Sequence, residues 1–291
     1  MQVIFHVGVH RTDEERLMKC LMKNRGDFAD FGTLAPPPGR YRRLIQQSMG
    51  ALKRGLAAPD ARDVLLDSIL DGDITERLLL SNQNFFATAK FAITRGVFYD
   101  GAPDRVTQLK ELFPGDQIEL FFAIRDPATF LPALLEKSDF TDPMELTRGT
   151  DPRALRWSEF IARMRHAHPD VPLTVWCNED SPLIWAQIIR EMAGINPGTR
   201  IRGGFDLLSE IMSHEGMKRF RAYLAQHPDM TEIQKRRVMV AFLDKFARED
   251  MIEEEIDLPG WTEELIDELT EIYDDDVFEI SRIQGVNFIA P

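Results

Sequence analysis

The sequence predicts an α/β protein in which a parallel sheet is covered by helices on both faces. Short apolar runs, bounded by turn or helix signals, alternate with longer segments whose apolar residues recur every three or four positions. Strands that alternate with helices run parallel, because each helix carries the chain back to the start of the next strand. With 291 residues and 44% hydrophobic content, the chain is long enough to bury a sizeable core.

The predicted elements follow the chain in order. Four apolar runs are expected to be strands, at 3–9, 78–81, 118–124 and 173–177. Helical patterns lie between and after them, at 14–23, 41–54, 60–70, 105–112, 128–136, 152–166 and 182–192. Further helices are expected at 207–212, 216–225, 231–248 and 262–273. We therefore expect a single domain over 1–291, in which 205–291 forms a mainly helical layer or subdomain.

The net charge of −13 is concentrated near the C-terminus. Residues 249–279 include 15 acidic side chains and no Lys or Arg, so the rest of the chain is close to neutral. We interpret the acidic run as a solvated helix face. A near-neutral body gives no support for nucleic-acid binding, although a local basic pocket can still bind an anion.

The composition also bears on compartment and redox state. No apolar run approaches the ~20 residues of a membrane-spanning helix, and MQVIFHVGVH lacks the order of a signal peptide. We expect a cytoplasmic protein without a membrane span. Cys20 and Cys177 are then expected to be free thiols. The spacing of His166 and His168 completes no metal-ligand set, so no metal site is predicted.

Several short motifs recur in a fixed order along the chain. They are FHVGVHRT at 5–12, LLLSNQ at 78–83, FAIRDP at 122–127 and NEDSP at 178–182, with GVNFI at 285–289 ending an expected C-terminal helix. As an ordered set they resemble the motifs of the bacterial sulfotransferase family. That resemblance implies a P-loop-type, three-layer α/β fold and 3'-phosphoadenosine 5'-phosphosulfate (PAPS) as co-substrate, with transfer of its sulfuryl group to the hydroxyl of a small-molecule or carbohydrate acceptor.

The resemblance also implies roles for three residues. Arg11 would stabilise the leaving phosphate, Thr12 would contact the sulfuryl oxygens, and Arg125 would hold the 3'-phosphate. The positions suit these roles, because a strand that ends in a helix N-terminus presents unpaired N–H groups to an anion. Arg125 follows a strongly apolar strand, and its alternative role is an ion pair with Asp126 or another neighbouring carboxylate.

The chain departs from the family pattern in the first loop. Asp13, Glu14 and Glu15 stand where the family has Gly, Thr and Thr, and carboxylates cannot donate hydrogen bonds to an anion. Thr12 and Glu15 have the spacing of a capping box, in which the helix satisfies its own first N–H groups. Each carboxylate would repel a bound anion by about 1 kcal/mol in water and about 4 in a partly buried cleft.

The candidate catalytic base also differs. Gln83 stands where the family strand often ends in Glu, and an amide has no useful basicity, although it can orient a substrate. His10 is the substitute base that the sequence offers, and its alternative role is structural. Ala133 replaces a Ser that would contact the 3'-phosphate. These losses predict a sulfotransferase-like protein with impaired donor binding and catalysis.

Other interpretations stay open. The main alternative is a non-catalytic binding or scaffold protein that keeps the fold. A nucleotide kinase or NTPase is disfavoured because no G-K-[ST] follows the first strand. The basic segment 40–43 would either line an anionic acceptor site or pair with the acidic C-terminal region. Arg200 and Arg202, which precede two glycines, are candidates for binding the adenosine 3'-phosphate, and an exposed face can support a homo-oligomer.

Overall fold

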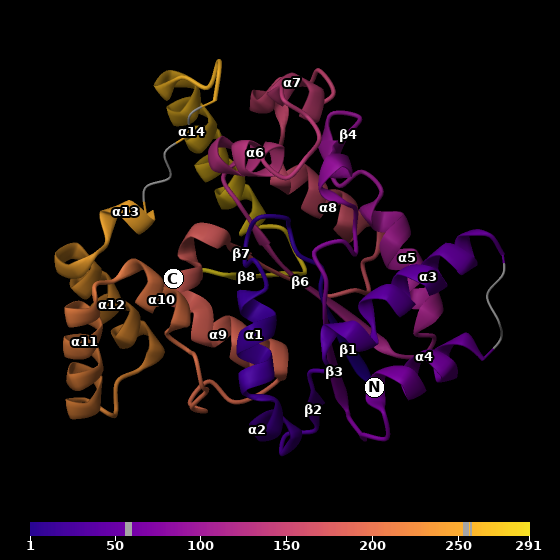
Figure 1. Cartoon of the computed structure of the whole chain (residues 1–291), viewed down its shortest axis with the longest axis horizontal. Coiled ribbons are helices and arrows are strands. Elements are labelled where there is room, and N and C mark those ends of the chain that lie inside the picture. The colour runs from indigo at the N-terminus through magenta and orange to yellow at the C-terminus, as the bar shows by residue number, and fades with distance from the viewer. Residues whose placement is uncertain (56–59, 253–255, 257) are drawn as a thin grey trace.

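A computed structural model describes residues 1–55, 60–252, 256 and 258–291 (Figure 1). Six strands form one parallel sheet in the order β2-β3-β1-β6-β7-β8. They are β1 (Gln2–His6), β2 (Thr33–Leu34), β3 (Arg77–Ser81), β6 (Gln117–Ile124), β7 (Leu173–Cys177) and β8 (Val286–Ile289). A separate antiparallel hairpin consists of β4 (Ile93–Thr94) and β5 (Val97–Phe98). The predicted α/β class and parallel sheet are confirmed.

The central strands contain continuous apolar runs because both of their faces are buried. Phe5 of β1 lies opposite Leu80 of β3 and Leu120 of β6, and all three side chains are fully buried. Such continuous apolar runs are typical of parallel sheets with helices on both sides. The expected strand at 3–9 ends earlier, at His6, so residues 7–15 form a loop at the carboxyl end of β1.

Helices cover the two faces in separate layers. One layer contains α1 (Arg16–Lys23), α2 (Arg25–Ala29) and α9 (Ser181–Ala193). The other contains α3 (Arg42–Lys53), α4 (Ala61–Leu70), α5 (Ala102–Leu112), α6 (Pro127–Leu135), α8 (Trp157–Ala167) and α14 (Glu263–Ile280). The short helix α7 (Pro143–Leu146) follows α6, and 3₁₀ turns occur at Pro38–Arg40, Ala89–Phe91, Pro152–Ala154 and Asn178–Asp180. The result is a three-layer α/β arrangement.

The C-terminal portion does not form one layer: it consists of helices beside α9, a helix on the opposite face of the sheet and the edge strand β8. Helices α10 (Asp206–Ile211), α11 (His214–Gln226) and α12 (Glu232–Phe246) share a small core and pack beside α9 (Figure 1). After α13 (Glu249–Ile252), helix α14 packs against α6 and α8 on the opposite face of the sheet. Among the described residues, no helix combines the length and apolar character needed to cross a membrane.

The expectation that 285–289 ends a helix is wrong. Helix α14 ends at Ile280, and Val286–Ile289 is the edge strand β8, paired in parallel with β7. The side chains of Val286 and Phe288 pack against one core, whereas that of Ile289 packs against the other. This alternation has the two-residue period of a strand.

The strand order creates a crevice in the middle of the sheet. From β1 the chain continues to β2 on one side of the sheet, and from β6 it continues to β7 on the other side. The loops that follow β1 and β6 therefore diverge, which leaves a crevice at the carboxyl ends of these neighbouring strands. Ligands of open α/β sheets bind at such a switch point.

Candidate functional site

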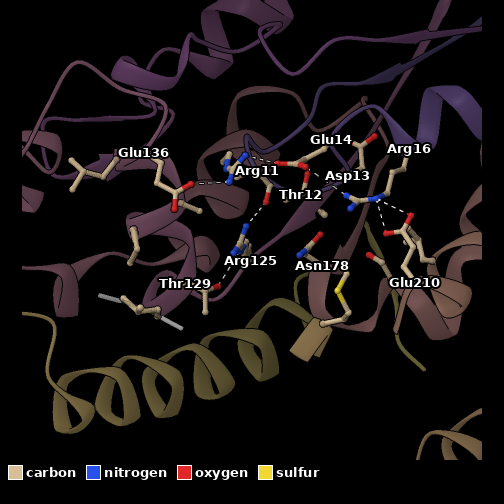
Figure 2. Close-up of a pocket in the computed structure, with 18 of the residues that line it drawn as sticks. Arg11, Thr12, Asp13, Glu14, Arg16, Arg125, Thr129, Glu136, Asn178 and Glu210 are labelled. Carbon is tan, nitrogen blue, oxygen red and sulfur yellow. Dashed lines mark hydrogen bonds and ion pairs between the residues drawn. The ribbon is translucent and has the colours of Figure 1, made fainter. Parts of the chain in front are cut away.

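A cleft of about 890 Å³ lies beyond the carboxyl ends of β1, β6 and β7 (Figure 2). Its base includes Ala123 of β6 and Trp176 of β7. Polar lining residues come from the loop after β1 and from residues that follow β6 and β7. Apolar lining residues include Leu207, Ile211 and Met251. The cleft thus occupies the switch point of the sheet.

The loop after β1 has an unusual backbone. Arg11, Glu14 and Glu15 have positive φ angles of 60°, 45° and 68°, in the left-handed region that non-glycine residues rarely adopt. Each such residue costs of order 1 kcal/mol, and residues of this kind cluster at ligand sites and switches. Surrounding contacts must therefore hold this loop in place.

The predicted capping box is wrong. The Thr12 hydroxyl donates to the carbonyl of Val9 at 2.7 Å, so it does not cap the helix. Glu15 is itself the N-cap residue, in a left-handed conformation, and α1 begins only at Arg16. The Glu15 carboxylate instead forms an ion pair with Arg42 of α3 at 2.8 Å. The helix starts later than the spacing predicted because the backbone turns at Glu15.

Asp13 occupies the start of α1. Its carboxylate accepts a hydrogen bond from the Leu17 N–H at 3.1 Å, and its carbonyl accepts one from the Arg16 N–H at 2.8 Å. These are two of the N–H groups that a helix N-terminus would otherwise offer to a phosphate or sulfate. The chain therefore satisfies them itself.

A row of alternating charges crosses the cleft (Figure 2). Arg11 pairs with Glu14 and, through Nη2, with Oε2 of Glu136 at 3.1 Å. Arg16 contacts the same Glu14 at 3.8 Å and pairs with Glu210 of α10 at 3.0 Å. Glu136 caps the C-terminus of α6, so the row joins α6, the loop, α1 and α10. Arg11, the cation expected to bind a donor phosphate, therefore forms ion pairs with the carboxylates of Glu14 and Glu136.

Arg125 lies directly after β6 and lines the same cleft. Its Nε donates to the Thr129 hydroxyl at 3.0 Å, and its Nη1 donates to the carbonyl of Arg11. Its own carbonyl accepts from Trp157 Nε1 at 2.8 Å. The structure therefore brings together three of the predicted residues, Arg11, Thr12 and Arg125.

The two candidate catalytic groups lie elsewhere. His10 is only 4% exposed, and its ring nitrogens lie 2.8 Å from the Tyr99 hydroxyl and 3.1 Å from Asn84 Oδ1. Burial lowers the pKa of His10 below its usual value. Gln83 is exposed on the loop after β3. Neither side chain lines the cleft.

The segment that carries Arg125 is fixed by the carboxyl groups of Asp126 and Glu179. Asp126 accepts from the Ala128 N–H at 2.8 Å, capping α6, and from the Thr270 hydroxyl at 2.7 Å. Glu179 accepts from the Asp126 N–H at 3.0 Å and from the Tyr273 hydroxyl at 3.1 Å. Burial raises the pKa of both Asp126 and Glu179. These contacts tie α6 to α14.

Sequence reasoning missed Glu136 and Glu210. The Arg11–Glu136 contact joins residues 125 positions apart, and Glu210 belongs to α10, which follows the loop by almost 200 positions. No local pattern marks either residue. In the basic segment 40–43, Arg40 forms an ion pair with Asp71 at 2.6 Å, and Arg42 forms one with Glu15. Neither partner belongs to the acidic C-terminal segment.

The two cysteines do not line the cleft. Cys20 and Cys177 are free and buried, as expected. Burial raises the pKa of Cys20 to about 11 and that of Cys177 to about 12, so both are protonated at neutral pH. Within the part of the chain that the structure describes, no three His, Cys, Asp or Glu side chains are grouped to hold a metal ion.

Comparison with known proteins adds no assignment. No model of a known protein family matches the chain, and a search of curated proteins finds no match. The function must therefore be argued from the geometry of the cleft.

Proposed function

We propose that this chain is a sulfotransferase-like protein whose cleft is closed to PAPS by its own carboxylates, so that sulfuryl transfer is impaired. One observation carries the proposal: Arg11, the cation of the loop after β1, is paired with Glu14 and Glu136. The position of the cleft at the switch point of a parallel sheet supports a site of this kind.

The charges of the cleft decide the affinity for the donor. A bound phosphosulfate would meet Glu14 and Glu136 beside Arg11, with Asp13 at the start of α1. A carboxylate about 4 Å from an anionic group costs about 1 kcal/mol in water and about 4 at the effective dielectric of a protein surface. Micromolar binding amounts to only about 8 kcal/mol. Two or three such repulsions remove most of that affinity.

Residual activity, where it exists, would be in-line transfer to a hydroxyl acceptor. Catalysis of this type depends on positioning and charge stabilisation rather than on covalent chemistry by the protein. Arg11 would stabilise the leaving phosphate, Thr12 the sulfuryl oxygens and Arg125 the 3'-phosphate. The ion pairs of Arg11 with Glu14 and Glu136 must open before Arg11 can contact the donor.

A second candidate is a non-catalytic binding or scaffold protein that keeps the cleft. The placement of His10 favours it, because both ring nitrogens of this candidate base contact Tyr99 and Asn84 outside the cleft. Gln83 is likewise outside, so no group from the predicted catalytic set can accept the proton of an acceptor hydroxyl there.

Titration calorimetry with PAPS and with its 3',5'-bisphosphate product tests the proposal. We expect no binding by the natural chain below millimolar ligand. The double variant Glu14→Gln and Glu136→Gln should bind at least about tenfold more tightly, because removing one repulsion of 1.4 kcal/mol has this effect. Glu215→Gln on α11, which removes the exposed carboxylate of another ion pair, is the matched control and should change nothing.

The outcomes separate the two candidates. Micromolar binding by the natural chain contradicts closure of the cleft. An unchanged affinity in the double variant shows that carboxylate repulsion is not the cause. With hydroxyl compounds such as phenols and sugars added as acceptors, an impaired transferase is supported if the double variant moves the sulfuryl group from PAPS to an acceptor oxygen and releases the bisphosphate. If it binds both nucleotides but leaves PAPS intact with each of these acceptors, the non-catalytic protein is supported.

A further inference from the structure

A second depression, of about 510 Å³, lies outside the cleft. It is formed by Asp27 of α2, the loop 200–206 and Arg221 of α11. It shares no lining residue with the cleft. The cleft touches the start of α1, whereas Asp27 lies beyond the end of that helix, which is about 12 Å long. A ligand in the depression would therefore contact none of the residues that line the cleft.

Three arginines line the depression, and their charges are only partly neutralised. Arg202 pairs with Asp27 at 3.2 Å, and the nearby Asp206 pairs with Lys23. Arg200 and Arg221 are exposed, and the side chain of neither has a hydrogen bond or ion pair within the described residues. Two guanidinium groups that line one concave surface without carboxylate partners favour an anion there.

The loop that carries these residues is held rigidly. The side chain of Asn24, 1% exposed, donates to the Arg202 carbonyl at 2.8 Å and accepts from the Arg202 N–H at 2.7 Å. The Cys20 thiol donates to the same carbonyl at 3.4 Å. A loop fixed before the ligand arrives loses little conformational entropy on binding.

Gly203 is required by this arrangement. Its φ of +78° is left-handed, and a Cβ there would lie 2.7 Å from Oδ2 of Asp206 and 3.2 Å from Sγ of Cys20. A larger residue would push the loop away from α1. The close approach therefore depends on glycine, which also leaves the backbone open toward the depression.

One side of the depression is aromatic. Phe205 lines it, half-buried, and packs edge-on against Phe220 with ring centroids 5.2 Å apart. The volume lies in the range of small-molecule pockets, and the combination of an apolar surface with a few charged groups is usual for them.

We propose that this depression binds a small organic phosphate or sulfate ester, with its anionic group held by Arg200 and Arg221 and its organic part against Phe205. The planar guanidinium fork suits the oxygens of either group, so the two esters share one recognition chemistry. The proposal does not depend on whether the cleft binds PAPS.

The test uses the full chain and three probes: phenyl phosphate, phenyl sulfate and inorganic phosphate. In calorimetry at low salt, we expect at least one phenyl ester to bind at sub-millimolar concentration and more tightly than inorganic phosphate. Arg200→Gln with Arg221→Gln should weaken this binding at least about tenfold, because two charge-assisted contacts are lost. Both side chains are exposed, so unchanged thermal unfolding should show that the variant folds.

Two controls isolate the depression. Arg219→Gln removes an exposed arginine of the same helix that pairs with Glu215 and lies outside the depression, and it should leave ester binding unchanged. The Glu14→Gln and Glu136→Gln variant should also leave ester binding unchanged, even where it alters PAPS binding. This outcome keeps the present proposal distinct from the one for the cleft.

Several results would overturn the proposal. Failure of both phenyl esters to bind at millimolar concentration removes it, as does undiminished binding by the double arginine variant. Equal affinity for inorganic phosphate and the phenyl esters contradicts the role given to Phe205. A preference between phenyl phosphate and phenyl sulfate assigns the ester class while supporting the site.

Discussion

The carboxylate of Asp276 on α14 accepts a hydrogen bond from the backbone N–H of Trp157, the first residue of α8, at 2.5 Å. It also accepts one from the Ser158 N–H at 3.2 Å. Helix α8 has no capping side chain of its own at Arg156. One residue of the acidic C-terminal run is therefore a buried cap for a helix more than a hundred positions away.

Asp276→Ala should lower the free energy of unfolding by about 2 kcal/mol, because it removes a helix cap and leaves buried N–H groups unpaired. Asp275→Ala is the matched control, since Asp275 is exposed on the same helix and should change stability by less than about 0.5 kcal/mol. Denaturant unfolding measures both. Equal effects of the two substitutions would show that the cap contributes nothing.

Glu179 should make stability depend on pH. Burial raises its folded-state pKa, so the folded protein holds the proton more tightly than the unfolded chain does. The stabilisation from protonation is complete below the unfolded pKa of about 4.3 and is lost as the pH rises through the folded pKa. Glu179→Gln, which stays neutral, should therefore become more stable relative to the natural chain as the pH rises above about 4.

Unfolding free energies of the two proteins, measured from pH 4 to pH 8, give this difference. Glu271→Gln, which removes an exposed carboxylate from α14, serves as the matched control. A difference for Glu179→Gln that is flat or falls with rising pH would show that the folded protein does not hold this proton more tightly than the unfolded chain.

The sheet shows what the sequence could and could not predict. The strand at 173–177 was located correctly because an apolar run lies between a Pro and an Asn. The expected first strand is too long because Val7 and Val9 are buried as deeply as the strand residues, although β1 ends at His6 and Val7 adds one further backbone hydrogen bond, to the Phe121 carbonyl of β6. Hydrophobicity reports burial, whereas a strand also needs a hydrogen-bonded neighbour.

The cleft shows the same limit for function. Its position follows from the carboxyl ends of predicted strands, so Arg11 and Arg125 could be brought together from the sequence. The excess of carboxylates in the loop was also visible. The ion-pair partners of the loop residues cannot be predicted from the sequence, because Glu136, Glu210 and Arg42 belong to separate helices. Such pairings depend on tertiary packing and leave no local pattern.

Tyr99 should be important for stability because its hydroxyl is a hydrogen-bond partner of the buried His10. Its buried hydroxyl accepts from the His10 N–H at 3.2 Å and lies 2.8 Å from His10 Nδ1. Tyr99→Phe removes both contacts inside the core and should cost about 1 to 3 kcal/mol. Tyr223→Phe, at an exposed tyrosine, should cost less than about 0.5 kcal/mol. If thermal or denaturant unfolding finds the two variants alike, the buried contacts of His10 carry no stability.

Gly8 should be the least replaceable residue of the loop after β1. Its φ is +56°, and a Cβ there would lie 2.8 Å from Cα of Gln83, where the loops after β1 and β3 meet. Gly8→Ala therefore adds a backbone clash to the cost of a left-handed alanine, and we expect a loss of about 2 to 3 kcal/mol.

The matched substitution is Gly115→Ala. Gly115 has a similar φ of +79°, but a Cβ there would meet nothing within 4 Å, so only the conformational cost of about 1 kcal/mol applies. Denaturant unfolding of the two variants measures the clash as the difference between them. A clear difference would mean that contact with the backbone of Gln83 fixes the path of the chain into Arg11 and the cleft, whereas equal losses would mean that the loop can move aside.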